Sequence, residues 1–311
     1  AHPSHGRYPK GGMSIEITGA TRLVGVFGWP VSHTLSPKMH NAAFGALGLD
    51  WAYLPLPVPP ARVGDAVRGL PALGFAGANV TVPHKQAVLP FMDELTPEAR
   101  AIGAVNTIVV RRDGSLLGHS TDGGGFLADL ARLLPPPHPD GTLRPRPWRS
   151  DAILRALVLG AGGAARAIAY ALVRAGATVT VLNRTYTRAQ ELCRSLSDAL
   201  PDEEQRDSLE AGSWDWIPHM ARRADLIVNC TSLGLHEGDA MPWDPAVPLL
   251  PGQIVYDTIY NRPTELLAHA RACGATAVDG LGMLVQQGAL AFEMWTGVPA
   301  PVDVMAAALR S

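Results

Sequence analysis

A short apolar segment that runs directly into a glycine-rich turn and then an alanine-rich helix limits the fold of this chain more than any other feature. Residues Leu157 to Arg166 read LVLGAGGAAR, which fits the pattern G-x-G-x-x-A. In this pattern Gly160 permits the tight turn, Gly162 lets the backbone approach a pyrophosphate, and Ala165 allows close packing of the helix on the strand. The free N–H groups at the start of the helix would bind the anion. The alternative, an ordinary tight turn between a strand and a helix, is the weaker interpretation in this strand–turn–helix context.

The second half of the chain continues as an alternation of apolar strand-like segments and amphipathic segments. This alternation is typical of a parallel, doubly wound sheet covered by helices. The predicted strands are 154–159, 177–182, 225–230, 253–258 and 275–278, and the predicted helices are 163–175, 185–199 and 263–273. The proline-rich residues 135–150 before them predict a connector. We therefore expect an α/β protein of two domains, the second a Rossmann-like, dinucleotide-binding domain.

The residues that follow the second strand of this half indicate which dinucleotide it binds. Sites that prefer NAD place an Asp or Glu here, where it binds the ribose 2′-hydroxyl. This chain has Asn183, Arg184 and Thr185 instead, with Arg188 one helical turn later. Two guanidinium groups and a hydroxyl bind the 2′-phosphate that a carboxylate would repel. The hypothesis is NADP(H), and the alternative is two solvated arginines in an arginine-rich protein.

The first half of the chain predicts a second α/β unit with polar loops. Ser36 is expected to cap a helix that starts at Pro37 and ends near Leu47, and Lys85 is expected to open another helix. The other predicted elements are strands at Leu23–Phe27, Trp51–Leu56 and Gly77–Val82 and a helix at Val63–Leu73.

A hairpin follows. Asp113-Gly114 predicts a two-residue turn between strands at 105–112 and 115–121. In that register Asn106 pairs with Thr121, so Asn106 and Asp122 would finish close together at the open end of the ribbon. The last residues, from 283 to 310, predict two helices divided near 295–301.

The loops and strand ends of this half carry neutral hydrogen-bonding residues and one ionisable pair, Lys85 and Asp122. The neutral residues, one of them from the last helices, are Thr34, Ser36, Thr81, Asn106 and Gln287. Of the 26 basic residues only three are lysines, and an amine, unlike a guanidinium, loses a proton near neutral pH. Hydride reduction of a ketone requires a proton at the carbonyl oxygen, which a lysine ammonium oriented by a carboxylate supplies. From spacing alone, a surface ion pair is the more common outcome.

Composition excludes several classes of protein. Hydrophobic residues make up 47% of the chain and charged residues 17%, which excludes a disordered or fibrous protein. The net charge of −2, without a basic stripe, argues against a nucleic-acid partner. No apolar run reaches the ~18–20 residues of a membrane span. Three widely spaced cysteines predict a reducing, cytoplasmic location, and no metal site is expected because no histidine has ligand-like spacing.

Eight short motifs occur in an order that identifies a family. They are HTLSP at 33–37, NVTVPHK at 79–85, GAVNT at 103–107, STDG at 120–123, the glycine-rich turn, NRT at 183–185, NCTS at 229–232 and DGLGML at 279–284. Together they resemble the shikimate dehydrogenase family, and the resemblance runs from about Leu23 to the C-terminus. It implies reversible, NADPH-linked reduction of 3-dehydroshikimate to shikimate, in the shikimate pathway that leads to chorismate and the aromatic amino acids.

The resemblance also implies roles for individual residues. Lys85 would be the acid/base, paired with Asp122, and the hydroxyls of Thr34 and Ser36 would bind the substrate carboxylate. The other substrate contacts would be Thr81, Asn106, Asp122, Tyr260 and Gln287. The cofactor contacts would be Gly160, Ala161, Gly162, Gly163, Ala164, Asn183, Arg184, Thr185, Arg188, Thr231, Thr258 and Gly280. Two positions depart from many family members, which have Ser at position 34 and Met at position 258.

By the same resemblance, residues 21–122 plus 283–311 would form the substrate domain and residues 123–282 the NADP-binding domain, with a cleft between them that closes on the substrate. Residues 1–20 are expected to be a mobile leader, and a homodimer is favoured over a monomer. Three alternatives stay open: a quinate/shikimate dehydrogenase with relaxed use of NAD and NADP, an aminoshikimate-type dehydrogenase, and a non-catalytic regulator that kept the dinucleotide-binding fold.

Overall fold

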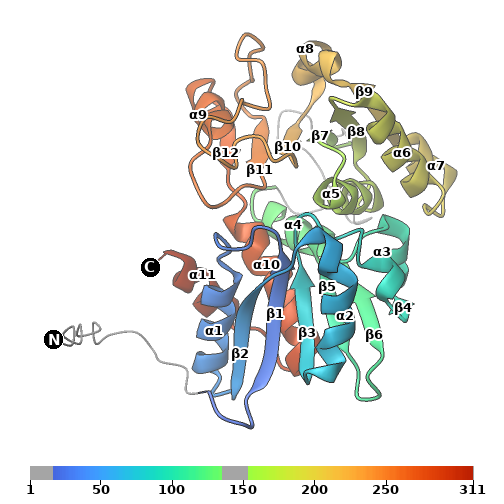
Figure 1. Cartoon of the computed structure of the whole chain (residues 1–311). Helices are drawn as coiled ribbons and strands as arrows, with labels where there is room; N and C mark the ends of the chain where they lie inside the picture. The colour runs from blue at the N-terminus through green and yellow to red at the C-terminus, as the bar shows by residue number, and fades with distance from the viewer. Residues whose placement is uncertain (1–16, 135–152, 311) are drawn as a thin grey trace.

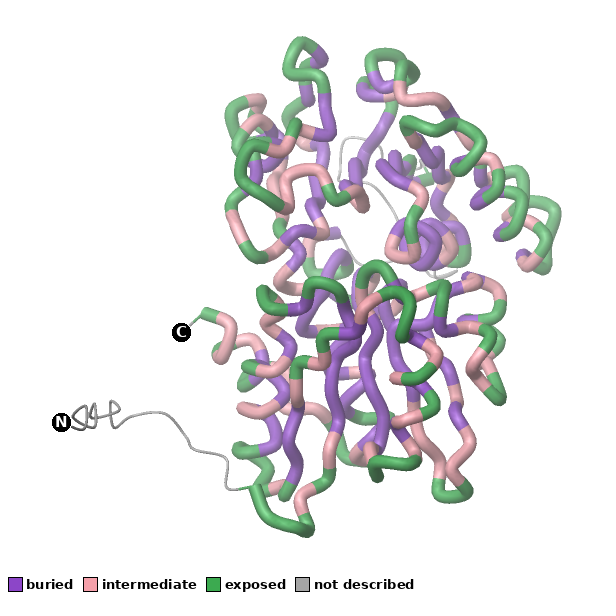
Figure 2. Tube along the Cα trace, viewed as in Figure 1, coloured by how far each residue is buried: buried purple, intermediate pink, exposed green. Residues whose placement is uncertain are grey.

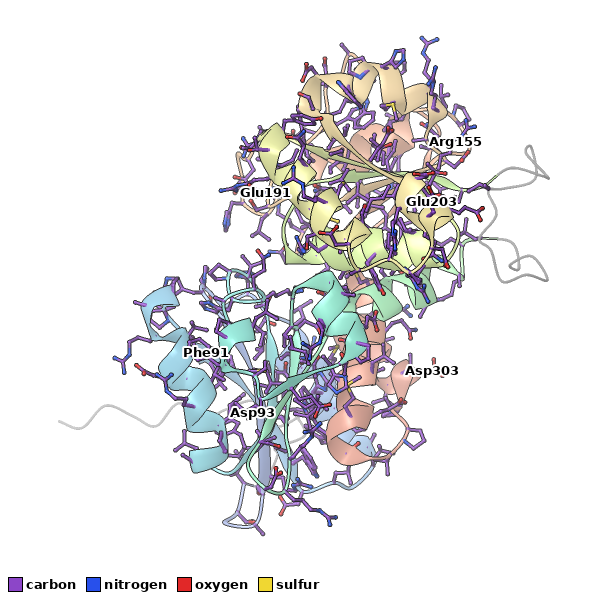
Figure 3. The ribbon with its side chains drawn as sticks, turned by 90° about the vertical axis from the view of Figure 1, so that its right-hand side faces the viewer. Phe91, Asp93, Arg155, Glu191, Glu203 and Asp303 are labelled. Carbon is purple, nitrogen blue, oxygen red and sulfur yellow. The ribbon has the colours of Figure 1, made fainter. Side chains whose placement is uncertain are left out.

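The computed structural model of the chain describes residues 17–134 and 153–310 and consists of two halves, each built around its own six-stranded sheet (Figure 1). The expected leader lies mostly, and the proline-rich connector entirely, outside the described residues. Figure 3, turned by 90°, separates the halves: the lower one carries Phe91, Asp93 and Asp303, and the upper one carries Arg155 and Glu191.

The first sheet is mixed and has the strand order β2-β1-β3-β5-β6-β4. Its strands are β1 (Arg22–Gly28), β2 (Trp51–Pro57), β3 (Phe75–Val80), β4 (Glu94–Leu95), β5 (Thr107–Val110) and β6 (Leu116–His119). The helices of this part of the chain are α1 (Ser36–Ala46), α2 (Val63–Ala72) and α3 (Pro97–Ile102). The three strands β2, β1 and β3 run parallel, whereas β5 is antiparallel to both of its neighbours. The parallel part directs the loops after β1 and β3 to the same edge of the sheet.

The second sheet is entirely parallel, with the strand order β12-β11-β10-β7-β8-β9. Its strands are β7 (Arg155–Leu159), β8 (Thr178–Asn183), β9 (Leu209–Ser213), β10 (Leu226–Asn229), β11 (Ile254–Asp257) and β12 (Thr276–Val278). The helices between them are α5 (Gly163–Arg174), α6 (Tyr186–Ser197), α7 (Glu203–Asp207), α8 (Ile217–Met220) and α9 (Glu265–Ala272). Along β7, Val158 belongs to one buried cluster and Leu157 to another, and Figure 2 shows the central strands buried. Burial on both faces is what a doubly wound sheet requires, and the predicted α/β fold is confirmed.

Two helices return the end of the chain to the first sheet. They are α10 (Leu281–Thr296) and α11 (Val302–Arg310), and both appear in orange and red beside the lower sheet in Figure 1. Phe292 and Trp295 of α10 pack in the same buried cluster as Val24 of β1. The helical ending was predicted; its packing brings residues from the far end of the chain to the first half.

Helix α4 (Asp122–Leu130) joins the two halves and is packed closely on both sides. A Cβ atom on Gly123 would lie 2.8 Å from the carbonyl oxygen of Ala167 on α5, and one on Gly125 would lie 2.5 Å from the backbone nitrogen of Gln287 on α10. Only glycine allows such approaches. The arrangement sets the position of Asp122, the first residue of α4, relative to both neighbouring helices.

The predicted pairing of Asn106 with Thr121 is wrong by one residue. β5 and β6 pair with Thr107 opposite His119, which leaves three residues in the turn instead of two. Gly114 adopts a φ of +85°, the left-handed conformation that a three-residue hairpin loop needs at its last position. The sequence Asp-Gly allows both turns, and the pairing of the strands selects the longer one.

Two expected helix starts are also wrong. Ser36 is the first residue of α1 rather than its cap, because Leu35 takes the capping position. Lys85 lies in a turn, since its carbonyl accepts a hydrogen bond from Val105 N (2.8 Å) instead of continuing a helix. The other predicted strands and helices are present, with ends within two residues of those expected. The short elements β4, β9, α3, α4, α7 and α8 were not predicted.

Candidate active site

A pocket of about 270 Å³ lies between the two halves. Loops that follow β1, β3, β10 and β11 line it, as do residues of α10. Ligands of open α/β sheets bind at such carboxyl ends of strands. All eight residues expected to bind substrate line this pocket: Thr34, Ser36, Thr81, Lys85, Asn106, Asp122, Tyr260 and Gln287.

Lys85 and Asp122 form an ion pair inside the pocket, with 2.5 Å between Nζ and Oδ2. The side chains are 15% and 6% exposed, so this is not the solvated surface pair that spacing alone favours. The second carboxylate oxygen of Asp122 accepts a hydrogen bond from Asn106 Nδ2 at 2.8 Å. The carboxylate is therefore held at both oxygens, and it directs the lysine ammonium, which retains hydrogens for a ligand.

Asn106 is the centre of the polar wall. Its Nδ2 lies 2.8 Å from Thr121 Oγ1, 2.8 Å from Asp122 Oδ1 and 3.2 Å from Gln287 Oε1, and its Oδ1 accepts the Thr121 N–H at 2.7 Å. Gln287 is in turn fixed by donating to the carbonyl of Leu284 at 2.8 Å. These side chains are buried, and their mutual bonds arrange them before any ligand arrives. Asn106 and Asp122 meet as expected, despite the different hairpin register.

The hydroxyls of Thr34 and Ser36 stand at the start of α1, where the Ser36 N–H donates to Thr34 Oγ1 (3.3 Å). Tyr260 reaches the pocket from the second half, and both Tyr260 and Thr34 line it. Burial raises the pKa of the Tyr260 phenol, so it remains a neutral donor and acceptor. Thr81 lies in the loop after β3, with its N–H bonded to the carbonyl of Phe27 (2.8 Å). A helix start and neighbouring hydroxyls can together bind an anion.

The glycine-rich turn has the geometry that a pyrophosphate needs. Gly160 has a φ of +106°, a left-handed conformation that favours glycine. No atom lies within 4 Å of where a Cβ of Gly162 would be, so a ligand can approach that backbone. A Cβ on Gly163 would lie 3.1 Å from Lys85 Cβ, which puts the turn in contact with the ion pair. Ala161 lies between these glycines, and Ala164 reaches the pocket itself.

The four residues expected to bind the 2′-phosphate lie on the second half, outside the pocket lining. Asn183 ends β8 and donates to the carbonyl of Thr185 (2.9 Å). Arg184, Thr185 and Arg188 are exposed at the start of α6. Neither arginine lies within 4 Å of a carboxylate of the described residues, and both guanidinium groups face solvent. These two exposed cations could bind an anionic group of a cofactor.

Three further residues expected at the cofactor line the pocket from the second half. Thr231 Oγ1 donates to Asn229 Oδ1 (2.7 Å), and Thr258 Oγ1 donates to the carbonyl of Asn229 (2.8 Å). A Cβ on Gly280 would lie 2.3 Å from the carbonyl oxygen of Thr258, so only glycine fits there. The Thr258 hydroxyl hydrogen is already donated to the backbone. Threonine in place of methionine at this position therefore gives the pocket no additional hydrogen-bond donor.

Asn79 is a pocket residue that the sequence analysis did not assign. It lines the pocket, is 6% exposed, and donates from Nδ2 to the carbonyl of Asn106 and to Thr107 Oγ1 (3.1 and 3.0 Å). Its position, two residues before Thr81, was a usable signal because alternate residues of a strand share a face. Cys230 also lines the pocket, and burial raises the pKa of its thiol.

Two other kinds of site are absent from residues 17–134 and 153–310. In that part of the chain no three or more His, Cys, Asp or Glu side chains are arranged to hold a metal ion. None of its helices combines the length and the apolar character needed to span a membrane.

Comparison with known proteins gives consistent matches over nearly the whole chain. Three family models match: the shikimate dehydrogenase substrate binding domain at residues 26–108, shikimate / quinate 5-dehydrogenase at 150–234, and the shikimate 5′-dehydrogenase C-terminal domain at 280–310. A shikimate dehydrogenase (NADP(+)) of Methanopyrus kandleri is 43% identical over 296 residues, covering 94% of this chain and 96% of the relative. One of Citrifermentans bemidjiense is 46% identical over 305 residues, covering 95% and 97%.

A solved structure matches as well. The shikimate 5-dehydrogenase of Thermus thermophilus, in complex with NADP(H) and shikimate, superposes with a TM-score of 0.77 at 36% identity, covering 93% of this chain and 99% of that one. These matches confirm the resemblance that the eight motifs indicate. The chain belongs to the shikimate dehydrogenase family of NADP-dependent oxidoreductases that act on a CH–OH group.

Proposed function

We propose that this chain catalyses the reversible reduction of 3-dehydroshikimate to shikimate, with Lys85 as acid/base and Asp122 as its partner. The observation that carries this assignment of roles is the mostly buried Lys85–Asp122 pair, 2.5 Å apart, in a pocket that also presents neutral hydrogen-bonding side chains. NADPH, when bound, supplies the hydride. The residues of the chain bind and orient the substrate and supply the proton.

The proton is held at Lys85 Nζ. In the direction of reduction, negative charge builds on the carbonyl oxygen of the substrate, and an Nζ–H within hydrogen-bond reach transfers its proton to that oxygen. In the direction of oxidation, the neutral amine takes the hydroxyl proton back. Asp122 orients the ammonium through Oδ2 while Asn106 fixes Oδ1, so the pair keeps one geometry. Acid–base help of this kind contributes a factor of ~10²–10⁴ in rate.

The neutral residues would orient the substrate. The hydroxyls of Thr34 and Ser36, at the start of α1, are placed to bind the carboxylate, with Tyr260 adding a phenol from the second half. Thr81, Asn106 and Gln287 would bind ring hydroxyls.

On the cofactor side, the turn from Gly160 to Ala164 would hold the pyrophosphate through backbone N–H groups. Asn183, Arg184, Thr185 and Arg188 would hold the 2′-phosphoadenosine end. Thr231, Thr258 and Gly280, which line the pocket, would stand beside the nicotinamide. The closeness of Gly163 to the stem of Lys85 supports a pyrophosphate turn next to the acid/base.

The test is oxidation of shikimate with NADP, followed by NADPH absorbance, for the wild type, Lys85→Ala and Lys38→Ala. Lys38 is an exposed lysine on α1 outside the pocket and serves as the matched control. We expect rapid wild-type turnover, a loss of at least ~10² in kcat for Lys85→Ala with little change in KM, and no effect for Lys38→Ala. A Lys85→Ala enzyme that retains wild-type kcat would remove the acid/base role.

The same assay distinguishes the alternatives. Turnover of quinate with NAD at a rate comparable to that of shikimate with NADP would indicate the quinate/shikimate dehydrogenase with relaxed cofactor use. The family model that matches residues 150–234 is named for both activities, shikimate / quinate 5-dehydrogenase. Turnover of an aminoshikimate in preference to shikimate would indicate that variant. NADPH binding without turnover of any of these substrates would indicate a regulator.

The proposal includes a homodimer in the cytoplasm. Light scattering of the purified chain would give the oligomeric state, and a mass equal to one chain of 32.9 kDa would exclude the dimer. Fractionation of the source cells would test the location.

A further inference from the structure

Tyr53 lies directly behind the pocket wall without lining the pocket. It is on β2 and 1% exposed. Asn41 of α1 holds its backbone from both sides, with Nδ2 donating to the Tyr53 carbonyl (3.0 Å) and Oδ1 accepting its N–H (2.8 Å). His40 stacks flat on its ring, with centroids 4.3 Å apart and an angle of 2°. Backbone and ring are therefore fixed, and the phenol has one direction in which to point.

The phenol hydroxyl contacts a residue that does line the pocket. It donates to Asn79 Oδ1 at 2.7 Å. The amide oxygen can only accept a hydrogen bond, so the phenol is the donor in this bond. Burial raises the pKa of Tyr53 well above its usual value, which keeps that hydrogen in place.

The bond from Tyr53 completes the hydrogen bonding of the Asn79 amide. Asn79 Nδ2 donates to the carbonyl of Asn106 and to Thr107 Oγ1, so both amide hydrogens have acceptors. A flipped amide would place its oxygen against the carbonyl oxygen of Asn106, which can only accept, so the amide has one favoured orientation. In that orientation Tyr53 supplies a donor to the amide oxygen, and the amide nitrogen holds the backbone of Asn106.

We propose that Tyr53 is a positioning residue for substrate binding, whose hydroxyl keeps the Asn79 amide in the geometry that the substrate requires. The inference rests on the proposed function, because it takes the pocket to bind a hydroxylated ring acid. Tyr53 thus holds Asn79, at the end of β3, without lining the pocket itself.

The test is Tyr53→Phe, which removes the hydroxyl and keeps the stacked ring. We expect KM for shikimate to rise about five- to tenfold, the scale of one buried hydrogen bond, while kcat falls less than about threefold and KM for NADP stays unchanged. Tyr256→Phe is the matched control: Tyr256 is also buried and its hydroxyl donates to Asp129 (2.8 Å), away from the pocket lining. That variant should lose thermal stability and keep both KM values.

A double-mutant cycle separates positioning from general loosening of the fold. In an Asn79→Ala background, Tyr53→Phe should raise KM for shikimate less than about twofold, because its main partner is already absent. Multiplicative effects, or a Tyr53→Phe enzyme with unchanged KM, would overturn the assignment while leaving the proposed function intact. An equal rise of KM for shikimate and KM for NADP in Tyr53→Phe would also overturn it, because that result indicates loosening of both halves. A wild type that neither binds nor turns over shikimate would overturn the assignment and the proposed function together.

Discussion

The two sides of the pocket are prepared for their ligands in different ways. On the substrate side, Lys85, Asp122, Asn106 and Gln287 are mostly buried and hydrogen-bonded to one another or to backbone. On the cofactor side, Arg184 and Arg188 are exposed, and the space around Gly162 is open. One side is a preformed network, whereas the other offers open backbone and solvated cations.

This difference follows from the ligands that each side is proposed to take. A small polyhydroxylated ring offers short hydrogen bonds at fixed angles, so the residues that read it must be held in position by each other. A phosphate is recognised mainly by charge and by free N–H groups, which tolerate side chains that order only on binding. Substitutions on the substrate side should therefore change catalysis or the affinity for shikimate, and those on the cofactor side should change the affinity for the cofactor.

The largest expected effect is at Asp122. Asp122→Asn removes the charge that orients Lys85 and keeps the size of the side chain, so kcat for shikimate oxidation should fall by ~10² or more. Asp65→Asn is the control, since Asp65 is an exposed carboxylate bonded to Arg62 and Arg68. A kcat within threefold of wild type in Asp122→Asn would show that the network is not what positions the lysine.

The next effect is on the choice of cofactor. Replacing both Arg184 and Arg188 by Gln removes two cationic contacts to the 2′-phosphate, so KM for NADPH should rise about 100-fold while KM for NADH and kcat stay the same. Arg194→Gln, an exposed arginine at the other end of α6, should change neither KM. A fall in kcat at saturating NADPH would contradict the separation between the two sides.

The dependence of stability on pH should come in part from the substrate side. Burial lowers the pKa of His40 to about 3, from 6.5, so the unfolded chain binds a proton that the folded chain does not. The free energy of unfolding therefore falls as the pH drops below about 6.5, and it keeps falling until about pH 3. Between pH 7 and pH 5 the loss from this group is about 2 kcal/mol.

Urea unfolding at pH 7 and pH 5 measures that loss. The slope with pH should be smaller in His40→Phe, which cannot bind a proton, and unchanged in the control His219→Gln, at an exposed position. Burial also lowers the pKa of His119, which adds a slope of the same sign in all three proteins. An equal pH dependence for wild type and His40→Phe would contradict the neutral, stacked state of His40.

The smallest effect is expected where the two sides touch. In Gly163→Ala the new Cβ would lie 3.1 Å from Lys85 Cβ and 3.2 Å from its Cδ, which displaces the lysine by a few tenths of an ångström. We expect kcat to fall about threefold while thermal stability stays the same or rises, because alanine favours a helix. A raised KM for NADPH with unchanged kcat would place the role of Gly163 on the cofactor side alone.

Local patterns were sufficient for much of the fold. The alternation of apolar and amphipathic segments in the second half predicted its central strands and helices. The side-chain periods of a strand and of a helix depend only on residues close together in the sequence. Strand β9, Leu-Glu-Ala-Gly-Ser, was missed because its residues have little preference for strands and it forms by pairing with β8. Likewise Lys85 was expected to open a helix, and only the bond from Val105 shows why it does not.

By itself, the sequence determined the glycine-rich turn, the alternation of the second half and the set of residue types available for chemistry. Those features depend on backbone conformation and on residues a few positions apart. Tertiary structure alone decided that Gln287 meets Asn106 across 181 positions, that Gly163 touches Lys85, and that Tyr53 stands behind Asn79. Such contacts depend on how closely α4, α5 and α10 pack, and the energies of packing are set by atoms that are distant in sequence.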